Sequence, residues 1–109
     1  MPFQERRKYE RKPYVKPLKF RLKASHVDKS RANEIEYEGV SFDVSKGGIG
    51  MITRDPLNVD DILFFKDEIK VNNFIATSGV VKWVQRLADT TYRSGLEFLD
   101  VRSNSEGTD

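Results

Sequence analysis

Residues 34–53, EIEYEGVSFDVSKGGIGMIT, contain the strand, turn and strand on which the predicted fold depends. At the start of this stretch, apolar residues alternate with glutamates, which is the two-residue period of a half-buried β-strand. The apolar positions change phase at Gly39, and this change predicts a bulge or bend there. The paired glycines after Ser45 predict a turn, because glycine adopts backbone angles that other residues avoid. We therefore expect two consecutive strands joined by residues 45–48.

The rest of the chain shows the same kind of pattern and no convincing amphipathic helix. Around Phe20, for example, apolar residues alternate with lysines and an arginine. The predicted strands are residues 18–24, 34–44, 49–53, 62–65, 70–85 (interrupted at Asn72-Asn73) and 92–99. Strands separated by turns predict an all-β antiparallel barrel or sandwich. The barrel is favoured for so short a chain, because closure removes exposed strand edges.

The composition indicates one domain, with no segment that directs the chain to a membrane. The chain has 109 residues, enough for one compact core. It has no apolar stretch near the roughly 20 residues that span a bilayer, and its first residues lack the apolar segment of a secretory signal. It also has no cysteine, which excludes disulfides and thiolate chemistry. We expect a cytoplasmic protein.

The net charge of +2 is unevenly distributed along the chain. Residues 1–31 contain eleven basic and three acidic residues, a net charge of +8, whereas residues 32–109 have a net charge of −6. A basic segment beside a mildly acidic one favours a partner with phosphate groups, although a solvated terminus explains the charge equally well. We predict a flexible basic arm at 1–13, a barrel domain at 14–100 and a polar tail at 101–109.

No pattern in the sequence indicates an enzyme. The single histidine, His26, lies in a polar stretch, and no Gly-x-Ser-x-Gly elbow surrounds a candidate nucleophile. The acidic pairs Asp60-Asp61 and Asp67-Glu68 flank short apolar strands, so we interpret them as solvated turn residues rather than a metal site. We therefore predict a binding protein without a metal or cofactor.

Two motifs have the chemistry to bind a guanine nucleotide. The first is Arg-x-x-x-Arg at Arg7 and Arg11, and the second is Asp-x-Ser-x-x-Gly at Asp43, Ser45 and Gly48. An arginine fork bonds the O6 and N7 acceptors of guanine or pairs with phosphate. A carboxylate complements the opposite edge of the base, where N1 and N2 are donors. Each motif alone is explained by a basic tail or by a turn whose side chains bond their own backbone.

The order of these motifs resembles the signature of the PilZ domain family. Its members have Arg-x-x-x-Arg in an N-terminal arm and Asp/Asn-x-Ser-x-x-Gly about thirty residues later. Residues 79–84, GVVKWV, and 92–98, YRSGLEF, look like the last two strands of the family. The likeness extends from about Arg6 to Asp100. It implies a six-stranded antiparallel barrel that binds the bacterial second messenger cyclic di-GMP.

The resemblance also implies a role for each matching residue. Arg7 and Arg11 grip guanine and phosphate from the arm, and Asp43 and Ser45 contact the guanine of the other side, with Gly48 shaping the turn. Two further positions are implied to contact the ligand, Arg6 and Trp83. Arg6 corresponds to a position that influences whether one or two stacked ligands bind, so an intercalated dimer is expected. Trp83 flanks a guanine on this view, although a strand tryptophan is more often part of the core.

We expect ligand binding to order the arm over the barrel and to change the surface offered to a downstream protein. That protein acts in motility, exopolysaccharide synthesis or regulation.

One alternative function is that of a barrel that binds single-stranded nucleic acid, with Phe20, Tyr37, Phe64 and Trp83 as its stacking platform. Another is a PilZ-like adaptor that binds protein only. Many relatives have a helix after the last strand, but residues 101–109 show no apolar stripe, which leaves oligomerisation through such a helix without support.

Overall fold

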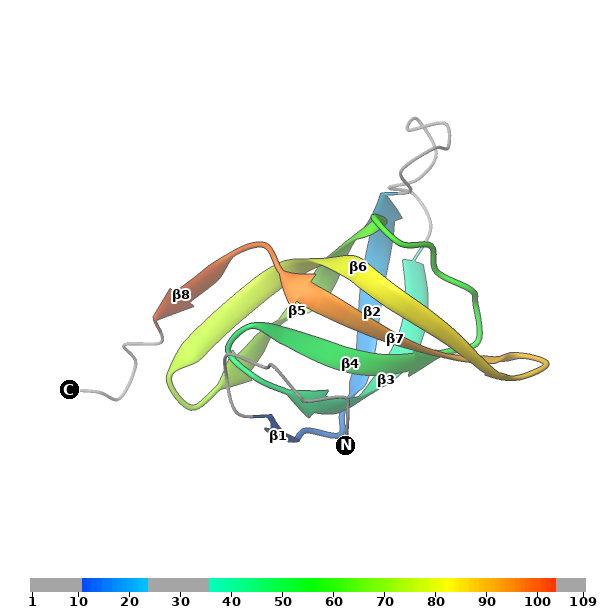
Figure 1. The fold of residues 1–109 in the computed structure, drawn as a ribbon. Coiled ribbons are helices and arrows are strands. Elements are labelled where there is room, and N and C mark those ends of the chain that lie inside the picture. Colours follow the sequence, from blue (N-terminus) through cyan, green and yellow to red (C-terminus); the bar gives the residue numbers. More distant parts are fainter. Residues whose placement is uncertain (1–10, 24–35, 104–109) are drawn as a thin grey trace, which may run out of the picture.

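The computed structural model describes residues 11–23 and 36–103, and all of their regular structure is β-strand. Figure 1 shows the strands wound around a common core. Their bounds are β1 Lys12–Pro13, β2 Pro17–Lys23, β3 Glu36–Val44, β4 Gly48–Thr53, β5 Ile62–Val71, β6 Phe74–Ala88, β7 Thr91–Phe98 and β8 Val101–Ser103. In this part of the chain no helix is long and apolar enough to cross a membrane.

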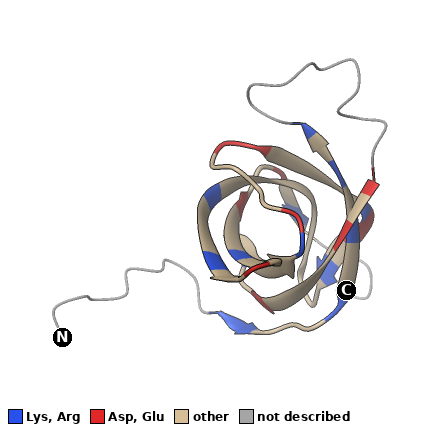
Figure 2. Cartoon of the chain, turned by 90° about the vertical axis from the view of Figure 1, so that its right-hand side faces the viewer, with Lys and Arg blue, Asp and Glu red and all other residues tan. Residues whose placement is uncertain are grey.

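Six of these strands form a closed antiparallel barrel, as the sequence predicts. The pairing order is β3-β2-β5-β6-β7-β4, and β4 pairs with β3 to close the ring. Every pair of neighbours is antiparallel. Figure 2 views this ring end-on, with basic and acidic residues both distributed around its wall. Closure leaves the six strands without a free edge along the paired stretches.

The core consists of the inward-facing residues of all six strands. Phe20, Met51 and Leu63 are fully buried, and exposed residues lie between buried ones on β2 and β5, whereas β4 is buried except for the partly exposed Ile52. At roughly 25 cal/mol for each Å² of apolar surface removed from water, a fully buried side chain of this size contributes about 2–3 kcal/mol. The core therefore holds the barrel wall in a fixed register, and the outward-facing residues on that wall are held in place with it.

Two details of the strands differ from the sequence prediction. The register shift in β3 lies between Ser41 and Asp43, not at Gly39, and Val40 points outward with 44% of its surface exposed. β5 continues to Val71 instead of ending near Phe65. Its polar part is solvated but stays extended, since Ile69 to Val71 pair with β6 across the turn at residues 72–73. That turn separates two strands, where we expected one interrupted strand.

Two short strands extend the barrel at its ends. β1, in the predicted arm, pairs with β3 beyond the end of β2, and β8, in the predicted tail, pairs with β6 beyond the end of β7. Between β7 and β8, the carboxylate of Asp100 accepts hydrogen bonds from the backbone and hydroxyl groups of Thr77 and Ser78. Burial by itself would raise the pKa of Asp100, but these hydrogen bonds outweigh it and hold the pKa below its usual value.

One acidic residue lies in an environment that the sequence did not indicate. Asp61 is 1% exposed, and its Oδ2 accepts a hydrogen bond of 2.8 Å from the backbone of Asn58. The interpretation of Asp61 as a solvated turn residue is therefore wrong. Its carboxylate closes the loop before β5, which explains why this polar group is buried.

Candidate ligand-binding site

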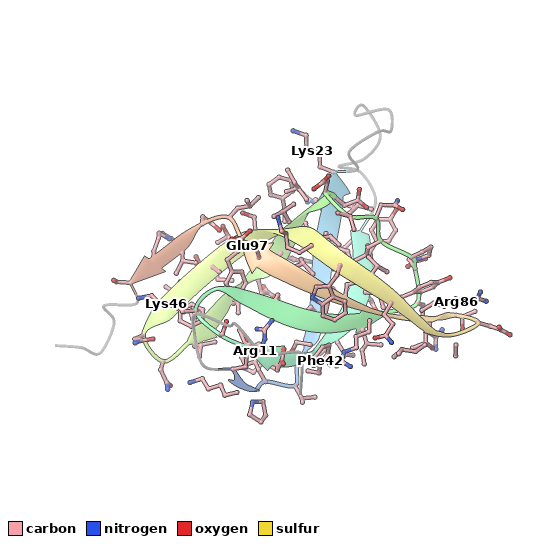
Figure 3. All side chains as sticks on the ribbon, in the orientation of Figure 1. Arg11, Lys23, Phe42, Lys46, Arg86 and Glu97 are labelled. Carbon is pink, nitrogen blue, oxygen red and sulfur yellow. The ribbon has the colours of Figure 1, made fainter. Side chains whose placement is uncertain are left out.

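The predicted binding residues Arg11, Asp43, Ser45 and Gly48 lie together, and we call them the charged half of the site. Arg11 Nη1 donates to Ser45 Oγ at 3.4 Å and to the carbonyl oxygen of Gly48 at 3.3 Å. Arg11 Nε lies 3.7 Å from Asp43 Oδ2. Figure 3 shows Arg11 pointing towards the β3–β4 hairpin. Residues 34 and 37 positions apart in sequence thus meet on one surface of the barrel.

The hairpin between β3 and β4 fixes the position of Ser45. Ser45 and Gly48 exchange two backbone hydrogen bonds, of 2.9 and 3.3 Å, around the two residues Lys46 and Gly47. The hydroxyl of Ser45 also accepts a hydrogen bond of 3.1 Å from the backbone of Gly47. The self-bonded turn and the binding motif are therefore the same structure, since one hydroxyl serves both the turn and Arg11.

Gly48 is required by the close approach of β4 to β7. A Cβ atom at this position would lie 2.0 Å from the carbonyl oxygen of Leu96. Because that oxygen belongs to the backbone of a paired strand, no rotamer change relieves the contact. The glycine therefore keeps the hairpin against β7 and places its own carbonyl oxygen where Arg11 binds it.

The segment between β1 and β2 is tied to β3 by Ser41. The Ser41 hydroxyl donates to the carbonyl oxygen of Tyr14 and accepts a hydrogen bond of 3.1 Å from the backbone of Lys16. Two backbone hydrogen bonds, Tyr14 to Phe42 and Ser41 to Lys16, add to this connection. Burial raises the pKa of the Tyr14 hydroxyl, which therefore stays neutral at physiological pH. These bonds fix the chain just after Arg11 and so limit where its side chain can lie.

Among the described residues, Arg11 Nε and Asp43 Oδ1 of the charged half are buried and have no hydrogen-bond partner. Leaving a buried donor or acceptor unpaired costs about 1–3 kcal/mol, and more when the group is charged. An unpaired carboxylate oxygen and an unpaired guanidinium N–H are the groups that would bond the donor edge of a guanine and a phosphate oxygen. Both atoms therefore have bonding capacity that the described residues do not use.

Beside the charged half, two aromatic rings lie over paired glycines, a feature that the sequence analysis missed. Gly50 and Gly95 are directly opposite each other on β4 and β7. Ring atoms of Phe42 lie 2.4 Å from the position of a Cβ on Gly50, and the Trp83 indole Nε1 lies 2.1 Å from the position of a Cβ on Gly95. The absence of side chains on these glycines therefore allows both rings to pack against the sheet. Isolated glycines within predicted strands were the signal that could have indicated such a close approach.

Arg93 completes this group, and we call Phe42, Trp83 and Arg93 the aromatic half of the site. The Arg93 guanidinium carbon lies 4.5 Å from the centre of the Phe42 ring and 5.8 Å from that of Trp83. Both distances are within the range of cation–π attraction. Trp83 is 41% exposed, so it is not a core residue and one side of its ring faces solvent. The exposed ring is suited to stacking on a base.

The remaining predictions concern Arg6, Arg7 and the four aromatic residues of the nucleic-acid-binding alternative. Arg6 and Arg7 lie outside the described residues, so their roles stay predictions. Of the four aromatics proposed for nucleic-acid binding, Phe20 is fully buried and stacks on the half-buried Tyr37. Phe64 is exposed, but it pairs with Ser78 of β6, five residues along that strand from Trp83. The four rings therefore form no common stacking surface.

Comparison with known proteins agrees with this geometry. A family model for the PilZ domain matches residues 5–108. The chain belongs to the PilZ domain family. Among solved structures, the PilZ chain is similar to the Bacillus subtilis inhibitor of motility MotI/DgrA, with a TM-score of 0.52 at 19% identity over 91% of this chain. The chain spans 45% of that protein's length, and at this identity the likeness supports the fold alone. No curated protein matches the chain.

Proposed function

We propose that this PilZ domain is a cyclic-di-GMP receptor that passes the presence of the second messenger to a downstream protein without catalysing a reaction. The observation that carries the proposal is the meeting of the two signature motifs. Arg11 from the first motif contacts Asp43, Ser45 and Gly48 of the second. A guanidinium and a carboxylate held this close complement the phosphate and the donor edge of a guanine nucleotide.

The charged half suggests how the ligand binds. Asp43 Oδ1 accepts from N1 and N2 of a guanine, while Arg11 turns from Asp43 towards a phosphate or the O6 and N7 acceptors. The ion pair between Arg11 and Asp43 is long, at 3.7 Å, and part of both side chains is exposed. Exchanging such a pair for ligand contacts costs little, because the ligand supplies each group with a new partner of the opposite kind.

Arg6 and Arg7, which precede Arg11, couple ligand binding to a change in the surface of the protein. Cyclic di-GMP carries two negative charges, and Arg6 and Arg7 bind it together with the charged half. Ordering this segment has an entropic cost that the charge-assisted hydrogen bonds offset. The rearranged segment changes the surface next to β1, where a partner involved in motility, exopolysaccharide synthesis or regulation binds. Arg6 also accommodates a second, intercalated ligand molecule. The protein acts in the cytoplasm, where the messenger is made.

Titration calorimetry with cyclic di-GMP tests the proposal. Wild type binds, and Arg7→Ala and Arg11→Ala each bind at least tenfold more weakly, as expected from the loss of about 1.5–3 kcal/mol for a hydrogen bond to a charged group. Lys12→Ala is the matched control, because Lys12 is also basic and adjacent to Arg11, but exposed. Binding of equal strength by wild type and the arginine variants contradicts the assignment. The absence of binding by wild type supports the adaptor that binds only protein.

A further inference from the structure

The aromatic half contains an arginine, Arg93, whose guanidinium lies against two aromatic rings. In the described residues, Arg93 has cation–π contacts to Phe42 and Trp83 but no hydrogen-bond or ion-pair partner. A guanidinium that stacks on a ring uses its flat face, so its N–H donors remain available around its edge. Arg93 therefore presents an unpaired fork of donors that two rings hold in position.

The position of Arg93 relates this fork to the charged half. Gly50 pairs with Asp43 on one side and with Gly95 on the other, and Gly95 pairs with Trp83. This row places the carboxylate and the indole on opposite sides of two residues that have no side chain. Arg93 lies two residues before Gly95 on the same face of β7, where Arg93 is exposed and the Trp83 ring covers Gly95. A base stacked on Trp83 would thus have Asp43 and Arg93 within the same small surface.

We propose that Arg93 is a specificity-determining residue that bonds the O6 and N7 acceptors of the guanine stacked on Trp83. The inference rests on the proposed function, because it assigns a further contact to the same ligand. Guanine has donors on the edge that suits Asp43 and acceptors on the edge that suits an arginine fork. Adenine presents an amino donor in place of O6, so the same fork disfavours it.

Two neighbouring basic residues are less suited to this role. Lys82 forms an ion pair of 3.7 Å with Glu97, and a lysine offers no planar fork. Arg86, at the far end of the β6–β7 hairpin in Figure 3, pairs with Asp89 at 3.2 Å. Arg93 differs from both in having a planar fork that lies against rings rather than against a carboxylate.

The test is a double-mutant cycle between the protein and the ligand, measured by titration calorimetry on the full chain. One partner is Arg93→Met, which keeps the length of the side chain and removes the fork. The other is a cyclic di-GMP analogue in which a CH group replaces each guanine N7. For wild type we expect about tenfold weaker binding of the analogue than of cyclic di-GMP, within the range of a bidentate arginine–guanine contact.

Arg93→Met should bind cyclic di-GMP about tenfold more weakly than wild type does and should show no further loss with the analogue. Arg93→Lys should behave like Arg93→Met, because it keeps the charge without the fork. Arg86→Met is the matched control and should bind both ligands as wild type does. Thermal unfolding midpoints equal to that of wild type confirm that these exposed substitutions leave the fold intact.

Three outcomes overturn the inference. The first is an Arg93→Met variant that binds cyclic di-GMP as wild type does. The second is a loss with the N7 analogue that persists unchanged in Arg93→Met, since another arginine then contacts N7. The third is an Arg93→Lys variant with wild-type affinity, which indicates a contact to phosphate through charge alone. If wild type itself fails to bind cyclic di-GMP, the proposed function fails, and this result is distinct from all three.

Discussion

The charged half and the aromatic half of the site lie side by side but are held in place differently. In the charged half, Arg11 is bonded to Ser45 and Gly48, and its side chain is only 17% exposed. In the aromatic half, Trp83 and Arg93 are exposed, the indole lies against Gly95, and the Arg93 guanidinium lies 5.8 Å from the centre of the Trp83 ring. The protein's own hydrogen bonds therefore fix the first half, whereas the second depends on two glycines that leave room for rings.

This difference suggests separate contributions to binding. A pre-organised group of polar residues loses little conformational freedom when the ligand arrives, so it can supply most of the recognition energy. Exposed rings can shift to fit the base, and the stacking energy that they add depends less on exact geometry than that of a hydrogen bond. We therefore expect changes in the charged half to have larger effects than changes in the aromatic half.

The largest effect is expected for Asp43→Asn. The substitution removes the charged acceptor for guanine N1 and N2, and about 1.5–3 kcal/mol is lost for each hydrogen bond to a charged group, so affinity for cyclic di-GMP should fall about 100-fold. The free energy of unfolding should also fall, by about 1–3 kcal/mol, because the largely buried Arg11 guanidinium loses its carboxylate partner. Calorimetry and chemical denaturation measure the two quantities.

Asp67→Asn is the control for this substitution, since Asp67 is exposed on β5. It makes the same change of charge away from the site and should leave affinity unchanged. A similar loss of affinity in both variants would mean that net charge, rather than a contact to Asp43, determines binding.

The next effect concerns stability and distinguishes the glycines of the two halves. Gly48→Ala should lower the free energy of unfolding by about 1–3 kcal/mol, because its Cβ would overlap the backbone of Leu96. Gly95→Ala should lower it by less than Gly48→Ala does, since the new Cβ would meet the partly exposed Trp83 side chain rather than a strand backbone. Urea denaturation tests both. Equal losses would show that Trp83 is held as firmly as the backbone of β7.

A smaller change in affinity is expected for Trp83→Leu. Loss of a stacking partner costs about 1–3 kcal/mol for each base, and with one exposed ring we expect about a tenfold loss of affinity for cyclic di-GMP. Phe64→Leu is the matched control, because Phe64 has a similar exposure, 42% against 41%, and lies on β5. Unchanged binding by Trp83→Leu would remove the aromatic half from the site.

The smallest effect is expected away from both halves, at Asp100. The pKa of Asp100 is lower in the folded protein than its ordinary value of 3.8, so the ionised carboxylate stabilises the fold above about pH 4. This contribution is lost as the pH falls through that value and below. Thermal midpoints of wild type should therefore decrease more steeply in acid than those of Asp100→Asn, while both proteins bind cyclic di-GMP equally at neutral pH. Parallel pH profiles would contradict this role.

The sequence predicts the barrel well, because strand alternation is a local pattern, and alternation around Phe20 identifies β2. That Arg11 lies near Asp43 and Ser45 follows from no local pattern, and only the family resemblance led us to expect it. The bulge in β3 was misplaced at Gly39, because an outward-facing valine at position 40 has the same hydropathy as an inward-facing one.

Of the aromatic half, the resemblance indicated only Trp83, and its grouping with Phe42 and Arg93 depends on which residues of separate strands lie opposite each other. Phe42 lies on β3, Trp83 on β6 and Arg93 on β7. The strand β4, which carries Gly50, lies between β3 and β7. The extension of β5 was missed for a related reason. Its polar residues stay in a strand because Ile69 and Val71 are buried beyond them.

The central claim is that cyclic di-GMP binds where the two motifs meet, and chemical-shift mapping of the ¹⁵N-labelled chain tests it most directly. On addition of cyclic di-GMP, we predict the largest shifts at Arg11, Asp43, Ser45 and Gly48 and at the indole N–H of Trp83, the only tryptophan in the chain. Cyclic di-AMP at the same concentration should produce none of these shifts. An unchanged spectrum with cyclic di-GMP, or shifts confined to other parts of the barrel, would contradict the account.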